Sequence, residues 1–307
     1  METLIEVKNL TKDYGQGRGV FDVSFHVNKG ECFGFLGPNG AGKSTTIRHI
    51  MGFSIPDSGE TLLRGYGSDT KREKLMYKVA YVPGEVAMPK NLTGEEIIEE
   101  QVKLKKVKDL NKLKYLIDYF EVDPKLEAKD MSLGMKRKIA LVCAFSDDPD
   151  IIILDEPSSG LDIDMQAKFI DYILQLKSEG KTILLSSHMF SEVDACCDRI
   201  AIIKDGRIVS NFNSSDLKHK SRKEYFITLE NAEEANKLFQ KLNESNYESS
   251  FDSTRKNTVQ VFAYDESINE FMNIITQFEI VDFQEKKETL EEFFMSFYKE
   301  DLNYASI

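Results

Sequence analysis

The feature that most constrains this chain is the loop at residues 37–44, with the sequence Gly-Pro-Asn-Gly-Ala-Gly-Lys-Ser. It matches the pattern G-x-x-x-x-G-K-[ST] in full, between a strand-like run at residues 32–36 and a helix-like segment at 45–51. Glycines allow consecutive backbone N–H groups to turn inward, and the positive end of the following helix attracts an anion. A random chain of this length meets the pattern roughly once in a hundred cases. The loop therefore predicts a site for nucleotide phosphates.

Two side chains of this loop are expected to contact different parts of Mg²⁺-ATP. Lys43 is expected to bridge the outer phosphates, and the Ser44 hydroxyl is expected to ligate Mg²⁺. The residues that we expect to contact the nucleotide in this segment are Gly37, Pro38, Asn39, Gly40, Ala41, Gly42, Lys43, Ser44 and Thr45.

Two acidic residues end a second strand-like segment. Residues 151–154 are four consecutive aliphatic residues, and Asp155 and Glu156 follow them. Such a run indicates a strand inside a parallel sheet, so Asp155 emerges at the carboxyl edge, where ligands of α/β sheets bind. We expect Asp155 to hold the Mg²⁺ shell and Glu156 to polarise the attacking water as a general base. The alternative interpretation is a strand end whose charges are only solvated. It is disfavoured because the phosphate loop is present in the same chain.

A histidine ends a third such segment. Residues 182–187 read as a buried strand, and His188 follows at the same edge. A lone histidine is usually structural or merely exposed, but an imidazole in this place can donate a hydrogen bond to the γ-phosphate. The predicted catalytic residues are therefore Glu156, His188 and Lys43.

The chain has two parts that differ in charge. Of the net charge of −12, residues 221–307 carry −9, with 18 Asp and Glu against 9 Lys and Arg. This acidic balance disfavours nucleic acid as a partner and indicates a boundary near residue 215. We expect a large α/β domain at 1–215, interrupted by a helical insert at about 88–145. Residues 216–307 are expected to form a small α+β accessory domain of the ferredoxin-like βαββαβ type.

Several classes of protein are disfavoured by what the sequence lacks. No stretch approaches the roughly 18 apolar residues that cross a bilayer, and the first residues do not resemble a signal peptide. The expected location is therefore the cytoplasm. Cys32, Cys143, Cys196 and Cys197 lack the spacing of metal ligands and are expected to be buried thiols.

The remaining motifs resemble those of ATP-binding cassette (ABC) proteins. Residues 131–138, Met-Ser-Leu-Gly-Met-Lys-Arg-Lys, resemble the start of the signature helix, whose usual sequence is L-S-G-G-Q. Residues 159–162, Ser-Gly-Leu-Asp, match the D-loop of that family, and His188 matches its switch histidine. Tyr14 lies where the family places an aromatic ring that stacks on adenine; its alternative role is packing beside a flexible loop. The resemblance covers residues 3–215 in unbroken order.

The resemblance implies a fold, partners and a mechanism. The fold is a P-loop NTPase of ABC type, with a mostly parallel core sheet, an N-terminal antiparallel β part and the helical insert. Two such domains pair head to tail, as a homo- or heterodimer, and bind ATP between the phosphate loop of one and the signature helix of the other. Ser132, Gly134 and Met135 would contact that nucleotide. A separately encoded membrane permease would hold the protein at the inner face of the cell membrane, with residues 85–104 as candidates for its docking groove.

Some positions depart from the family pattern. Leu133 and Met135 replace a glycine and a glutamine of the signature, and Glu85 stands near the place of the Q-loop glutamine that touches Mg²⁺. Glu85 either ligates the metal in its place or is a solvated loop acid. These variants are similar to those of ABC-2 type exporter ATPases, so they favour an active ATPase that serves export.

Two other functions compete with a transport ATPase. A soluble ABC ATPase acting on a cytosolic macromolecular complex usually has two cassettes or a long coiled coil, and this chain has one cassette and no sustained heptads. An inactive regulatory subunit is disfavoured because Lys43, Asp155, Glu156 and His188 are all present.

Overall fold

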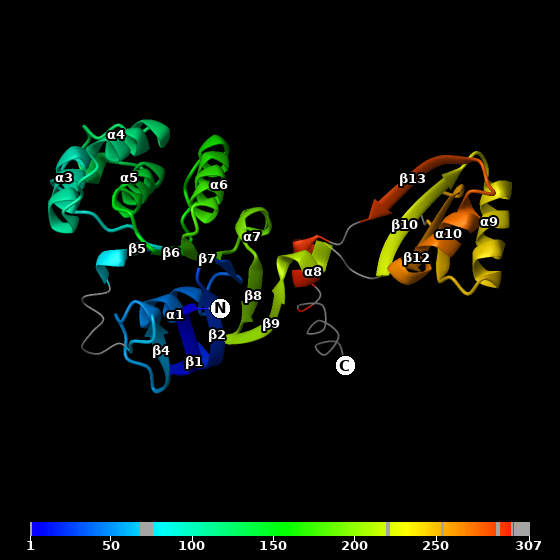
Figure 1. Cartoon of the computed structure of the whole chain (residues 1–307), viewed down its shortest axis with the longest axis horizontal. Helices are drawn as coiled ribbons and strands as arrows, with labels where there is room; N and C mark the ends of the chain where they lie inside the picture. The colour runs from blue at the N-terminus through cyan, green and yellow to red at the C-terminus, as the bar shows by residue number, and fades with distance from the viewer. Residues whose placement is uncertain are drawn as a thin grey trace. The chain divides into compact units, whose positions relative to one another are not determined.

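The computed structural model describes residues 2–67, 76–218, 222–252, 255–286, 289–295 and 297. The chain divides into two compact units, Met1–Ser214 and Ser215–Ile307, each built around its own sheets (Figure 1).

The core sheet of the first unit has six strands in the order β5-β6-β7-β3-β8-β9. Its first five strands are parallel, and β9 returns antiparallel to β8. Because β3, β6 and β7 are parallel neighbours, the segments that follow them meet at one edge of the sheet. The strands are β3 (Cys32–Leu36), β5 (Val79–Val82), β6 (Ile151–Asp155), β7 (Thr182–Ser187), β8 (Arg199–Lys204) and β9 (Arg207–Asn213).

A second, antiparallel sheet is formed by β1 (Thr3–Asp13), β2 (Gly19–Asn28) and β4 (Ser58–Leu63), in the order β2-β1-β4. The sequence pattern does not predict β4, which follows a Pro- and Gly-rich stretch. Strand β4 forms because it pairs with β1. Gly59 (φ 82°) lies so close to β1 that a Cβ there would be 2.3 Å from the Asn9 carbonyl oxygen.

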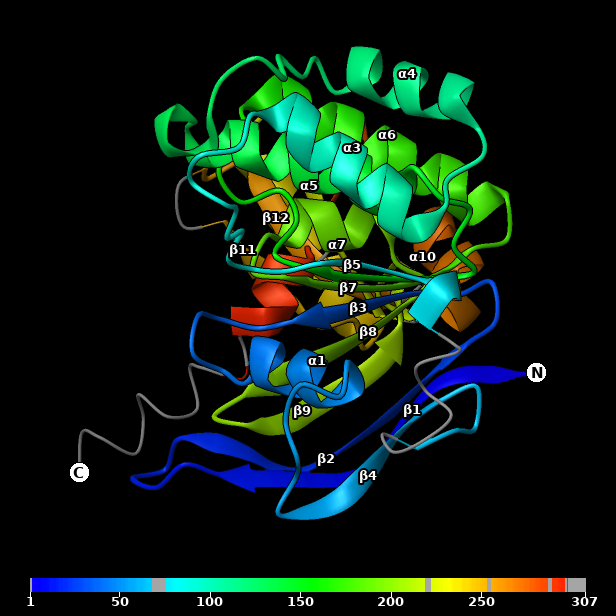
Figure 2. The ribbon, with the colours of Figure 1, turned by 90° about the vertical axis from the view of Figure 1, so that its left-hand side faces the viewer.

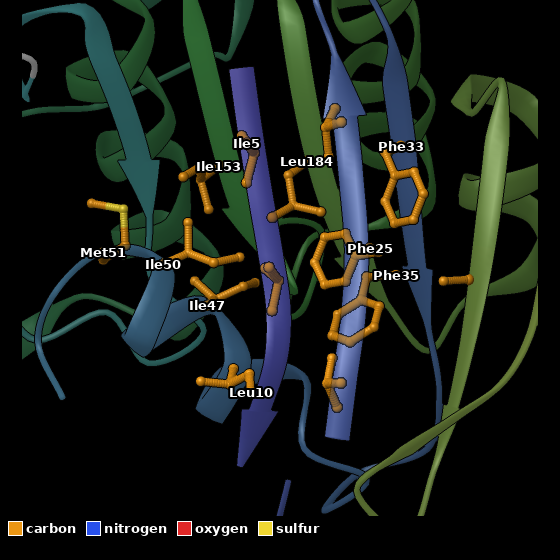
Figure 3. Close-up of a cluster of buried hydrophobic side chains, with 14 of the residues drawn as sticks. Ile5, Leu10, Phe25, Phe33, Phe35, Ile47, Ile50, Met51, Ile153 and Leu184 are labelled. Atoms are coloured by element: carbon orange, nitrogen blue, oxygen red, sulfur yellow. The ribbon is translucent and has the colours of Figure 1, made fainter. Parts of the chain in front are cut away.

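Helix α1 (Lys43–Ile50) lies between these two sheets (Figure 2). Its Ile47 and Ile50 join a core in which the rings of Phe25 and Phe33 stack at 5.1 Å between centroids (Figure 3). Burial of these side chains anchors the start of α1 directly after β3.

The other helices of this unit cover the opposite face of the core sheet (Figure 2). The insert begins at α3, where Thr93 and Glu96 form the predicted capping box. The helices are α3 (Gly94–Lys105), α4 (Leu110–Tyr119), α5 (Leu133–Phe145), α6 (Ile163–Ser178) and α7 (Phe190–Cys196), with short 3₁₀ turns at Met76–Lys78 and Ala128–Asp130. No helix in the described part of the chain is long and apolar enough to cross a membrane. The predicted architecture, a mostly parallel core sheet with an antiparallel N-terminal β part and a helical insert, is confirmed.

The second unit has the element order β-α-β-β-α-β, which is that of the ferredoxin-like arrangement. Its antiparallel sheet has the order β11-β12-β10-β13, and one face packs on helices through residues such as Ile227, Leu238 and Phe271. Thr289 and Glu292 form a second capping box. The elements are α8 (Ser214–Lys218), β10 (Arg222–Leu229), α9 (Ala232–Glu244), β11 (Ser249–Phe251), β12 (Thr258–Tyr264), a 3₁₀ turn (Asp265–Ser267), α10 (Ile268–Ile275) and β13 (Ile280–Lys286).

All four cysteines are free thiols. Cys32, Cys196 and Cys197 are buried as predicted, and Cys143 is half-buried.

Candidate active site

The phosphate loop lies between β3 and α1, and its backbone is shaped to receive an anion. Gly40 and Gly42 have φ of 84° and 112°, the left-handed region that favours glycine. At Gly42 a Cβ would also lie 2.7 Å from the Val20 side chain. Helix α1 begins at Lys43 without a side-chain hydrogen bond to its first N–H groups. Those groups are therefore available to phosphate oxygens.

Lys43 is a positioned cation inside this loop. The residue is only 5% exposed, and Nζ donates to the carbonyl oxygens of Gly37 (2.6 Å) and Pro38 (3.0 Å). The same Nζ lies 3.0 Å from Glu156 Oε1. The ammonium group thus joins the phosphate loop to the end of β6.

The two acidic residues at the end of β6, Asp155 and Glu156, have different surroundings. Asp155 is buried, and its Oδ1 accepts a 2.6 Å hydrogen bond from Ser186 Oγ on β7. Glu156 has φ of 50°, which costs a non-glycine residue about 1–2 kcal/mol. The left-handed backbone at this position places the Glu156 side chain between Lys43 and His188. His188 Nδ1 is hydrogen-bonded to Glu156 Oε2. The three predicted catalytic side chains therefore form one connected group.

The loop after β5 lies on Asp155. A Cβ at Gly84 would be 3.0 Å from Asp155 Oδ2, so this loop crosses close above the carboxylate. Glu85, the next residue, is exposed to solvent. The structure brings the backbone of the loop to Asp155, and the Glu85 side chain stays at the surface.

The segment that resembles the signature begins α5. Ser132 is the N-cap, and its Oγ accepts a 3.2 Å hydrogen bond from the N–H of Met135. Gly134 lies against the D-loop, where a Cβ would be 2.5 Å from the Gly160 carbonyl oxygen. Among the described residues, no hydrogen bond joins this helix start to the phosphate loop of the same chain.

Tyr14 directly follows β1 and is 54% exposed. Its N–H donates to the Arg18 carbonyl at 2.9 Å. The loop returns to the sheet at Gly19, whose carbonyl oxygen would be 3.4 Å from a Cβ on Gly42. The structure thus places the loop that begins at Tyr14 beside the phosphate loop.

The sequence does not predict the buried positions of three polar side chains in this region. Ser186 holds Asp155, Arg137 is fully buried, and Glu192 in the first turn of α7 is only 1% exposed. An acidic residue in the first turn of a helix is ordinarily a solvated partner of the helix dipole, so no signal marks Glu192 as buried.

Burial raises the pKa of Glu192 to about 7. The polar side chains of Ser187 and Ser158 and the charge of His188 act in the opposite direction, and the charge of Glu156 adds to the increase. Glu192 is therefore a neutral acid over part of the ordinary pH range.

This raised pKa predicts a pH dependence of stability. Between its ordinary pKa of 4.5 and about 7, Glu192 keeps its proton in the folded protein and loses it in the unfolded chain. The free energy of unfolding should therefore fall as pH rises through this window, by on the order of 3 kcal/mol. Glu192→Gln, which stays neutral, should melt higher than the wild type at pH 8 and similarly at pH 5. Circular dichroism melts at pH 5, 6, 7 and 8 measure this, and parallel profiles for both proteins would contradict it.

Comparison with known proteins agrees with this geometry. Residues 20–159 match the family model described as "ABC transporter". The linearmycin resistance ATP-binding protein LnrL of Bacillus subtilis is 36% identical over 219 residues, which are 70% of each chain. The bacitracin transport ATP-binding protein BcrA of Enterococcus faecalis is 29% identical over 299 residues, which are 96% of each chain.

A solved structure shows the same fold. The dimeric ATP-binding cassette MJ0796, in a post-hydrolysis state with ADP and Pi, superposes with a TM-score of 0.62 and 23% identity. The match covers 69% of this chain and 99% of that one. The chain belongs to the family of ABC transporter ATP-binding proteins and is an ABC ATPase, as the sequence motifs predict.

Proposed function

We propose that this chain hydrolyses ATP to energise a separately encoded membrane permease, and that the transport is export. The observation that carries the proposal is the connected group of Lys43, Glu156 and His188 at the carboxyl edge of an ABC-type core sheet. The direction is supported by relatives named for bacitracin transport and linearmycin resistance.

The chemistry begins with competition for Lys43. Phosphates bound by the loop N–H groups would draw the Lys43 ammonium away from Glu156 Oε1, because several negatively charged phosphate oxygens would then compete with one carboxylate oxygen for its three N–H donors. Glu156 is then free to accept a proton from water as the water oxygen attacks the γ-phosphorus and the bond to the ADP oxygen breaks. His188 holds Glu156 Oε2 and presents an imidazole to the γ-phosphate.

A Mg²⁺ site fits the residues on this edge. Ser44 supplies a hydroxyl in the first turn of α1, and Asp155 has Oδ1 held by Ser186 and Oδ2 facing the Gly84 loop. No group of three His, Cys, Asp or Glu residues in the described segments could hold a metal ion alone. Mg²⁺ suits such a sparse site, because it keeps several waters and binds substrate phosphates. When bound, it would neutralise charge on those phosphates.

Substitution of Glu85 tests whether its carboxylate takes part in this site. If the loop acts as a Q-loop, Glu85→Gln should retain wild-type ATPase activity or raise it by about twofold, because it removes negative charge near the phosphates. Steady-state phosphate release at saturating Mg-ATP is the measurement. Complete loss of activity would show that the carboxylate itself is required.

We propose a head-to-tail dimer as the active form. The start of α5, with Ser132, Gly134 and Met135, is a capped helix N-terminus suited to the phosphate of a nucleotide bound by a second copy or a related subunit. Tyr14 would stack on the adenine ring. The known dimer of a cassette with this fold supports the arrangement. Docking on the permease would place the chain at the cytoplasmic face of the membrane.

The competing function is that of an ABC ATPase on a cytosolic macromolecular complex. Affinity purification of the tagged chain from detergent-solubilised membranes of its host separates the two. Transport predicts a stoichiometric integral-membrane protein in the eluate, which should be absent when the same tag is placed on an unrelated soluble protein as a control. Recovery with ribosomes or another soluble complex, and with no membrane protein, would contradict the proposal.

A further inference from the structure

Arg137 is the largest fully buried side chain among the described residues, with 1% of its surface exposed. It lies on α5, less than one turn beyond Gly134. Removing a guanidinium from water is costly unless its donors are satisfied, so a buried arginine needs a specific set of partners.

Those partners are backbone carbonyl oxygens from two different loops. Arg137 Nη1 donates to Pro83 at 2.5 Å and Nη2 donates to Gly84 at 2.6 Å. On the other side, Nε donates to the Ser159 carbonyl oxygen at 3.4 Å. The planar guanidinium thus spans the gap between the loop after β5 and the D-loop, a geometry that the single ammonium of a lysine does not reproduce.

Both loops touch groups that the active site uses. Gly84 lies against Asp155 Oδ2, and Gly160, next to Ser159, lies against Gly134 of the signature segment. Glu85 directly follows the two carbonyls that Arg137 holds. Burial lowers the pKa of Arg137, while the negative charges of Asp155 and Glu156 act to raise it. The cation therefore also offsets the acidic charge behind the proposed metal site.

We propose that Arg137 is a positioning residue for ATP hydrolysis, which fixes the Pro83–Gly84 loop against Asp155 and ties that loop to the D-loop at Ser159. This inference rests on the proposed role of Asp155 in binding Mg²⁺. It also has a consequence for the dimer, because α5 would face the nucleotide of the partner while Asp155 faces its own. Arg137 then makes the signature helix, the Gly84 loop and the D-loop move as one body.

The test compares Arg137→Met and Arg137→Lys with the wild type. Misplacing the Asp155 side of the site should lower kcat by about ten- to a hundredfold in Arg137→Met and less in Arg137→Lys. Affinity for a fluorescent ATP analogue without Mg²⁺ should change by less than about threefold, because the phosphate loop is untouched. The Mg²⁺ concentration for half-maximal activity should rise, and amide exchange at residues 83–86 and 158–161 should accelerate.

Lys114→Gln is the matched control, since it removes one positive charge from the exposed surface of α4 in the same helical insert and should leave all four readouts unchanged. Wild-type kcat and wild-type amide exchange in Arg137→Met would overturn the inference and leave the proposed ATPase function standing. If Arg137→Met does not fold, Arg137→Lys is used in its place. Unchanged kcat, Mg²⁺ dependence and amide exchange in Arg137→Lys would then overturn the inference about Arg137. A wild-type protein without ATPase activity would instead contradict the proposed function.

Discussion

Glu156→Gln is expected to stop ATP hydrolysis and to spare ATP binding. The amide has the shape of the carboxylate but cannot accept a proton from water, so turnover should fall by about 10²- to 10⁴-fold. Lys43 and the loop N–H groups remain in place, so nucleotide affinity should persist. Steady-state phosphate release measures the first effect, and equilibrium binding of ATP measures the second. Wild-type turnover in this variant would remove Glu156 from the role of general base.

The same variant reports on the dimer, because ATP that is bound but not hydrolysed should hold two copies together. Light scattering with and without Mg-ATP should show a doubling of the solution mass if the chain pairs with itself. Glu244→Gln, an equivalent change on the exposed surface of α9, should retain activity. A monomer that still binds ATP would contradict self-pairing and point to the permease or a different ATPase subunit as the obligate partner.

Lys43→Ala is expected to abolish ATP binding or to weaken it by at least about a hundredfold. The change removes the buried ammonium that we expect to form charge-assisted bonds to the phosphates, each worth about 1.5–3 kcal/mol. It also leaves Glu156 without its cationic neighbour. Isothermal titration with ATP measures the loss, after circular dichroism has shown that the variant is folded.

Lys29→Ala is the control for that experiment. Lys29 lies at the surface, where its partner is Glu2, so its removal should leave nucleotide affinity unchanged. Wild-type affinity in Lys43→Ala would contradict the account of the phosphate loop. Comparison with Glu156→Gln then separates binding from chemistry, because the two substitutions affect opposite ends of one ion pair.

Strands with a strong local pattern could be predicted, and strands that depend on their partners could not. The aliphatic runs of β6 and β7 can be recognised as strands without knowing which strands lie beside them, because they are apolar enough for burial on both faces of a sheet. Strand β4 contains Gly59, and β11 has only three residues, Ser249–Phe251. Each is extended because a neighbouring strand supplies its hydrogen bonds, and strand propensity depends on such context.

The residues of the candidate site could be predicted to the extent that motifs and strand ends locate them. Lys43, Asp155 and His188 each follow a recognisable element, and parallel topology sends the ends of β3, β6 and β7 to one edge. The tertiary structure decided the rest: the left-handed backbone of Glu156, its contacts with Lys43 and His188, and the bond from Ser186 to Asp155.

By itself, the sequence determined the class of this protein and predicted which residues of the loop at 37–44 would hold phosphate, because these depend on spacing along a single segment. Only the tertiary structure decided which charged side chains are buried and what they hold. Arg137 and Glu192 look like ordinary surface residues of helices in sequence. Their burial depends on loops that are distant along the chain, and local patterns carry no information about such contacts.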